Sequence, residues 1–154
     1  MRLKFILLAQ ASQLVGMLFF GGISDRLGRR PAFTLYSLLT AAGLLALARF
    51  GPQMLAHPAW FWPVIATVGL GSGCTAGFGA LLSEMFPTGI RNTAMGTVYN
   101  LARAFQLVPQ LLMGVIAVRA GVGAGLGLAA VFALATAAWV WTLPETRAIA
   151  LRHE

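Results

Sequence analysis

Five long apolar runs, separated by short polar stretches, dominate the hydropathy pattern of this chain. Each run has roughly 20 residues, which at a helical rise of about 1.5 Å per residue crosses a hydrocarbon core of about 30 Å. The pattern therefore predicts an all-α fold, a polytopic membrane bundle of about five transmembrane helices in one domain. The predicted spans cover about 5–24, 32–50, 60–83, 94–117 and 122–143, and a polar tail follows at 144–154.

The first two runs are separated by residues 21–30, which read Gly-Gly-Ile-Ser-Asp-Arg-Leu-Gly-Arg-Arg. Ionised side chains are costly at the bilayer centre, so this segment predicts a hairpin turn outside the hydrocarbon. Pro31 suits the first position of the second helix, because its missing N–H would have no partner there. Gly51 and Pro52 predict the end of that helix. Trp60 marks the membrane interface at which the third helix enters.

Composition supports a membrane protein. Hydrophobic residues make up 58% of the chain and charged residues 10%, whereas soluble domains carry about 25% charged residues. The formal net charge is +7, but the basic residues stand singly at the ends of apolar runs and do not cluster on one face. We therefore expect the lipid bilayer and its anionic headgroups to be the partner of these charges, and not nucleic acid.

The basic residues divide unevenly between the two sides of a five-span bundle. The side with the C-terminal tail holds Arg26, Arg29, Arg30, Arg91, Arg147 and Arg152. The side with the N-terminus holds Arg2, Lys4, Arg49 and Arg119. The positive-inside rule favours the first side as cytoplasmic, which predicts a multi-pass protein of the cell (plasma or inner) membrane with a cytoplasmic C-terminus. All the acidic residues fall on the same side, within reach of its arginines: Asp25, Glu84, Glu145 and Glu154.

Glycines recur every four residues in the third run, at Gly69, Gly73 and Gly77. Small residues at this spacing allow two membrane helices to pack closely, which is the role we expect for them. The segment 71–76 also imitates a dinucleotide-binding loop. That interpretation requires an acidic residue about 20 positions later and a polar surrounding domain, and the chain has neither.

A polar stripe runs along the fourth predicted span and is formed by Tyr99, Arg103, Gln106 and Gln110, with Asn100 at its edge. At about 100° per residue, the first four side chains project within about 60° of one another, and Pro109 is placed to kink the helix. Arg103 falls close to the predicted bilayer midplane. Either Arg103 faces a water-filled cavity, as intramembrane charges often do, or its side chain extends to the headgroups.

Two glutamines, Gln10 and Gln13, share a face of the first predicted span. They either join the same cavity or form hydrogen bonds between helices. No Asp or Glu lies inside a predicted span, and the sequence shows no metal-ligand cluster and no nucleophile–base arrangement. We therefore expect neither an enzyme nor a metal or cofactor site.

Three motifs together resemble the C-terminal half of a major facilitator superfamily transporter. Within that family the resemblance is to the sugar and organic-solute porters of the metabolite:H+ symporter-like kind. Residues 21–30 are similar to the family's signature loop between the second and third helices of a half. Residues 84–91, Glu-Met-Phe-Pro-Thr-Gly-Ile-Arg, are similar to the segment that closes the tenth helix. Residues 144–147, Pro-Glu-Thr-Arg, resemble the segment after the twelfth. The resemblance implies that the five spans correspond to helices eight to twelve.

The resemblance also implies a cytoplasmic charge network that holds the gate closed in one conformation and separates in the other. Its members would be Asp25, Arg26, Arg29, Arg30, Glu84, Arg91, Glu145 and Arg147. Surface ion pairs are individually weak, but a network present in only one state biases the equilibrium between two states. The alternative is that these charges only anchor the topology.

The function implied by the resemblance is secondary active or facilitated transport of a small polar or anionic organic solute by alternating access. A transporter of this family has twelve helices, so the chain is expected to be truncated. Its N-terminal half would then be a separate chain that acts as a partner. The alternative is a non-transporting membrane module or inactive fragment that associates with another membrane protein.

Overall fold

The computed structural model describes residues 2–56 and 58–143, and within these it is helical apart from short turns. The elements are α1 (Arg2–Leu27), α2 (Arg29–Ala56), α3 (Pro58–Gly71), η1 (Ser72–Ala76), α4 (Gly77–Met85), α5 (Arg91–Phe105), α6 (Leu107–Ala120), α7 (Val122–Trp139) and η2 (Val140–Thr142). They combine into five apolar spans long enough to cross a membrane, at Leu3–Leu27, Arg29–Gln53, Ala59–Ser83, Arg91–Ala120 and Val122–Thr142. The all-α fold with five long apolar helices is thus confirmed.

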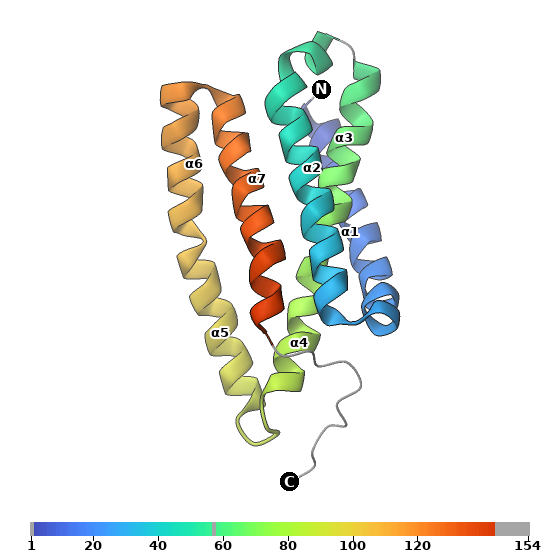
Figure 1. Cartoon of the computed structure of the whole chain (residues 1–154), viewed down its shortest axis with the longest axis vertical. Helices are drawn as coiled ribbons and strands as arrows, with labels where there is room; N and C mark the ends of the chain where they lie inside the picture. The colour runs from blue at the N-terminus through green and yellow to red at the C-terminus, as the bar shows by residue number, and fades with distance from the viewer. Residues whose placement is uncertain (1, 57, 144–154) are drawn as a thin grey trace.

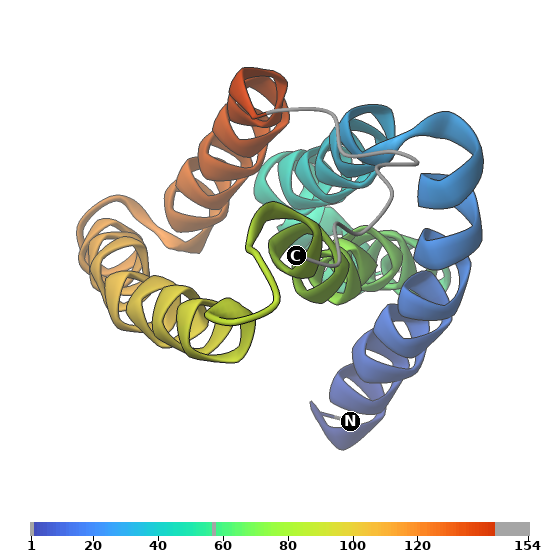
Figure 2. The ribbon, with the colours of Figure 1, turned by 90° about the horizontal axis from the view of Figure 1, so that it is seen from below.

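The spans form two groups that meet between α2 and α7 (Figure 1). In the first group α1, α2 and α3 pack against one another, with α4 continuing the line of α3. In the second group α6 packs against α7. Within the described chain, α5 packs only against α4 and α6, and the view from below shows α5 and α6 at the outer edge of the bundle (Figure 2). The fourth span therefore leaves most of its surface uncovered.

The turn between α1 and α2 is a single residue, Gly28. Its φ of 102° lies in the left-handed region that glycine tolerates without a Cβ clash. Its N–H donates to the carbonyl of Ser24 at 3.0 Å, which closes the last turn of α1. The charged segment 21–30 is therefore helical on both sides of Gly28, and Pro31 is the third residue of α2 where we had expected the first.

The prediction that Gly51 and Pro52 end the second helix is wrong, because α2 continues through Pro52 to Ala56. Proline removes the hydrogen bond to the carbonyl four residues earlier, here that of Ala48. Membrane helices tolerate this loss where neighbouring groups come close to the freed carbonyl. Here α7 approaches closely, since a Cβ added to Gly123 would lie 2.8 Å from the Ala48 oxygen.

The core of the bundle lies near the Gly28 end of α1 and α2. Phe20, Phe33 and Tyr36 are buried there, and the Phe20 ring meets those of Phe33 and Tyr36 edge-on, with centroids 5.0 and 5.1 Å apart. Such edge-to-face pairs add to the burial of the rings themselves. The Tyr36 hydroxyl donates to the Gly16 carbonyl at 3.1 Å. The core therefore fixes α1 against α2 beside the charged turn.

Candidate functional site

The charged turn contains an ion pair between Arg29 and Asp25. The Arg29 Nη1 lies 3.1 Å from the Asp25 Oδ1 and donates to the Ser24 hydroxyl at 2.7 Å. The Asp25 side chain is 69% exposed, so this pair contributes little stability by itself. Its position at the junction of α1 and α2 orients the guanidinium across the turn.

Arg30 connects this turn to the end of the last span. Its Nε donates to the Leu143 carbonyl at 2.7 Å, and its Nη2 donates to the same oxygen. One helical turn later, Thr34 accepts a hydrogen bond from the Trp141 indole at 3.1 Å. We call these contacts the α2–η2 clasp. Sequence reasoning placed Arg30 among acidic partners and did not identify this carbonyl, because a backbone acceptor carries no sequence signal.

The remaining charges of the predicted network lie in different places. Arg91 begins α5 and donates through Nε to the Phe86 carbonyl at 3.2 Å. Arg26 is exposed in the last turn of α1. Glu84 belongs to α4, but its side chain is not described, and Glu145 and Arg147 lie outside the described residues.

The polar stripe is divided by a break in the fourth span. Pro109 cannot donate to the Phe105 carbonyl, and α5 ends at Phe105 while α6 begins at Leu107. On α5, the Arg103 guanidinium lies 5.1 Å from the centre of the Tyr99 ring, a cation–π geometry. Asn100 is turned onto its own helix and donates to the Gly96 carbonyl at 2.9 Å. Tyr99 and Arg103 are both exposed.

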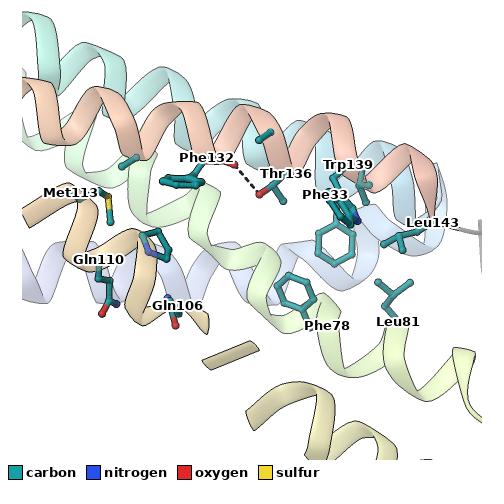
Figure 3. Close-up of a pocket in the computed structure, with 14 residues that line it drawn as sticks. Phe33, Phe78, Leu81, Gln106, Gln110, Met113, Phe132, Thr136, Trp139 and Leu143 are labelled. Carbon is teal, nitrogen blue, oxygen red and sulfur yellow. Dashed lines mark hydrogen bonds between the residues drawn. The ribbon is translucent and has the colours of Figure 1, made fainter. Parts of the chain in front are cut away.

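Gln106, at the break, and Gln110, on α6, line a cavity of about 680 Å³ between α6, α7, α4 and the start of α2. Figure 3 shows the two glutamines together at one end of the cavity and Leu81 and Leu143 at the other. Tyr99, Asn100, Arg103, Gln10 and Gln13 do not line it. Gln10 is exposed on α1 and Gln13 is half-buried.

The other cavity walls were not identified from the sequence. Phe33, Phe78, Phe132 and Trp139 come from three different helices, and Met113 lies beside the glutamines on α6. Apolar residues occur throughout these spans, so nothing in the pattern distinguishes lining residues from lipid-facing ones. The packing of α2 and α6 against α7, and of α4 against α2, brings them together.

The repeated glycines lie where the third span meets α1. A Cβ at Gly69 would lie 2.6 Å from the Ala9 carbonyl oxygen, and a Cβ at Gly73 would collide with the backbone of Gly16. A Cβ at Gly77 would collide with the Phe20 ring. Backbone approach of this kind is possible only for residues without side chains.

Within the described ranges, no group of three or more His, Cys, Asp or Glu side chains is placed to hold a metal ion. The interactions seen in the described helices include hydrogen bonds, a cation–π contact and an ion pair.

A match to the Major Facilitator Superfamily covers residues 5–153. The chain belongs to this family. Members of the major facilitator superfamily are membrane transporters and not enzymes, and the five apolar spans agree with a multi-pass protein in a lipid bilayer.

Two curated proteins illustrate the relationship. One, from Haemophilus influenzae, is named for metabolite transport and is 25% identical over 140 residues, which cover 90% of this chain and 33% of that protein. The other, from Cupriavidus pinatubonensis, is named for 4-methylmuconolactone transport and is 31% identical over 137 residues, which cover 85% of this chain and 30% of that protein. This major facilitator superfamily chain thus spans about a third of the length of the relatives it matches. No solved structure shows a significant match to it.

Proposed function

We propose that this chain is the C-terminal portion, helices eight to twelve, of a transporter that moves a small polar or anionic organic solute by alternating access. The observation that carries the proposal is the Tyr99–Arg103 pair on α5. A cation within a predicted membrane span is expensive unless it faces a polar cavity or a partner. No residue of the Arg91–Ala120 span is buried within the described chain, so a further part of the transporter would cover this face.

In this proposal Tyr99 and Arg103 bind the solute, and Gln106 and Gln110 extend the polar face past the break at Pro109. Asn100, at the edge of the stripe, and Gln10 and Gln13, on α1, are assigned to the same solute pathway. The first substrate to test is 4-methylmuconolactone, taken from the name of the Cupriavidus relative. An arginine is suited to an acidic or carbonyl-bearing solute because its guanidinium donates in a planar fork.

The cytoplasmic gate would be formed by the charged turn, the α2–η2 clasp and the remaining charges of the network: Asp25, Arg26, Arg29, Arg30, Glu84, Arg91, Glu145 and Arg147. In this assignment the protein lies in the plasma or inner membrane of the cell, with its C-terminus in the cytoplasm. The assignment is supported by the contact of Arg30 with Leu143, which joins two predicted cytoplasmic segments. A contact of this kind present in only one conformation would bias the alternation.

The test is uptake of labelled 4-methylmuconolactone by cells that express this chain with the part of the Cupriavidus relative that it does not match. We expect uptake only when both parts are present, and a loss of at least about tenfold for Arg103→Ala. Arg119→Ala, an exposed arginine at the end of α6, is the matched control. Unchanged uptake by Arg103→Ala would refute the binding role. Association of the two parts without uptake of any metabolite tested would favour the non-transporting module.

A further inference from the structure

The cavity between α2, α4, α6 and α7 has a chemical character different from that of the Tyr99–Arg103 face. None of the described residues that line it is charged. Its walls are mainly aromatic and aliphatic, with Phe33, Phe78 and Phe132 among them. A volume of about 680 Å³ falls in the range of small-molecule sites, which are typically apolar with a few placed polar groups.

Polarity changes from one end of the cavity to the other. Gln106 and Gln110 lie together at one end, and Leu81 and Leu143 lie at the opposite end (Figure 3). A carboxamide both donates and accepts hydrogen bonds, so the glutamine end suits an uncharged hydroxyl or carbonyl. Thr136 lies between the ends, and its hydroxyl already donates to the Phe132 carbonyl at 2.9 Å. Apart from the indole N–H of Trp139, the polar binding capacity is therefore concentrated at the glutamines.

An ion would be poorly accommodated in this cavity. Burial of a carboxylate or ammonium away from water is strongly unfavourable without an opposite charge, and the lining offers none. Arg103, the nearest arginine in sequence to the glutamines, does not line the cavity and is exposed over Tyr99. A neutral molecule with an apolar body avoids this cost and gains from the aromatic walls.

We propose that this cavity is a second binding site for an uncharged amphiphile that enters from the bilayer. It borders the proposed solute face at Gln106 and Gln110 but does not include Tyr99 or Arg103. The hydrogen-bonding head of the amphiphile lies at Gln106 and Gln110, and its apolar body extends past Phe132 and Phe78 toward Leu143. The site also contacts the α2–η2 clasp, because the Leu143 carbonyl accepts from Arg30 while Leu143 lines the cavity. The site does not depend on the proposed transport function.

The test uses Trp139, which lines the cavity, as a fluorescent reporter in the full chain reconstituted in lipid nanodiscs. Trp60, Trp62 and Trp141 are replaced by phenylalanine, and the unaltered chain is measured in parallel. The probes are ω-bromoundecanol and ω-bromoundecanoate, which share a chain and a quenching bromine and differ in charge at neutral pH. We expect saturable quenching of Trp139 by the alcohol. For the carboxylate we expect only the linear quenching that arises from partition into the bilayer.

Two variants test the location. Ala135→Phe places a ring in the cavity and should abolish the saturable component of the quenching, whereas Ala138→Phe, on the same helix but outside the lining, should retain it.

Gln106→Leu removes the carboxamide that forms hydrogen bonds with the head of the amphiphile, and should weaken binding of the alcohol about fivefold. Its control is Gln53→Leu, at an exposed position on α2 outside the lining. Linear quenching alone in the parent chain would overturn the proposal. Equal saturation by the carboxylate, or saturation unaffected by both Ala135→Phe and Gln106→Leu, would also overturn it.

Discussion

Arg30 and Leu143 are 113 positions apart in the sequence, yet the Arg30 Nε lies 2.7 Å from the Leu143 carbonyl oxygen. The carbonyl belongs to the end of the last span, where helical hydrogen-bond partners run out. A guanidinium is well suited to this position because two of its N–H groups converge on one acceptor. The second and last spans of the described chain are thereby joined at the same end of the bundle.

Replacement of Arg30 should loosen this junction. For Arg30→Lys we expect a loss of about 1–2 kcal/mol in unfolding free energy, because an ammonium does not reproduce the planar fork and the Leu143 carbonyl loses a charged donor. The measurement is denaturant unfolding in mixed micelles. Arg26→Lys, an exposed arginine four residues earlier, should change the unfolding free energy by less than about 0.5 kcal/mol. Equal effects of the two substitutions would contradict a role for the clasp.

The close approach of the third span to α1 predicts a sharp difference between two glycines. Gly73→Ala should cost about 1–3 kcal/mol, because the new methyl group collides with backbone atoms of Gly16 and Met17, which have no way to rotate aside. Gly79→Ala meets nothing within 4 Å and should be neutral or slightly stabilising, since alanine favours the helix. Thermal unfolding of the two variants in the same detergent distinguishes them. A neutral Gly73→Ala would show that the helices separate freely.

The turn at Gly28 should resist substitution for a conformational reason. Gly28→Ala places a Cβ at a φ of 102° and should destabilise the fold by about 1–2 kcal/mol. Gly22→Ala, in the helical part of the same charged segment with open space around it, serves as the control and should not destabilise. The same unfolding assay applies. If both alanines are tolerated equally, the backbone conformation at Gly28 does not hold the hairpin.

The break in the fourth span should depend on Pro109. In Pro109→Ala the new amide N–H at position 109 is able to donate to the Phe105 carbonyl, which joins α5 and α6 into a continuous helix. Hydrogen exchange of the amides around Gln106 should slow about fivefold, as expected for about 1 kcal/mol of added helix stability. Pro87→Ala, in the turn before α5, should leave that exchange unchanged. Unaltered exchange in Pro109→Ala would place the cause of the break elsewhere.

Hydropathy was sufficient to predict an all-α fold with five long apolar helices. Each span must satisfy its own backbone hydrogen bonds within the bilayer, so a run of apolar residues determines its helix without information from other spans. The reversal at residues 21–30 was likewise evident from charge and glycine. Pro52 misled the prediction because a membrane helix continues through proline where its surroundings satisfy the freed carbonyl, and a local pattern does not contain those surroundings.

The sequence alone determined that this chain crosses a membrane in five helices with a charged turn between the first two, because burial in hydrocarbon and the cost of charge are local properties. Only the tertiary structure decided that Arg30 holds the Leu143 carbonyl, that the polar stripe divides at Gln106, and that Gln106 and Gln110 share an uncharged cavity with Phe33. These features arise where helices distant in sequence pack together. Their partners are backbone carbonyls and apolar side chains, and these look alike at every position of an apolar span.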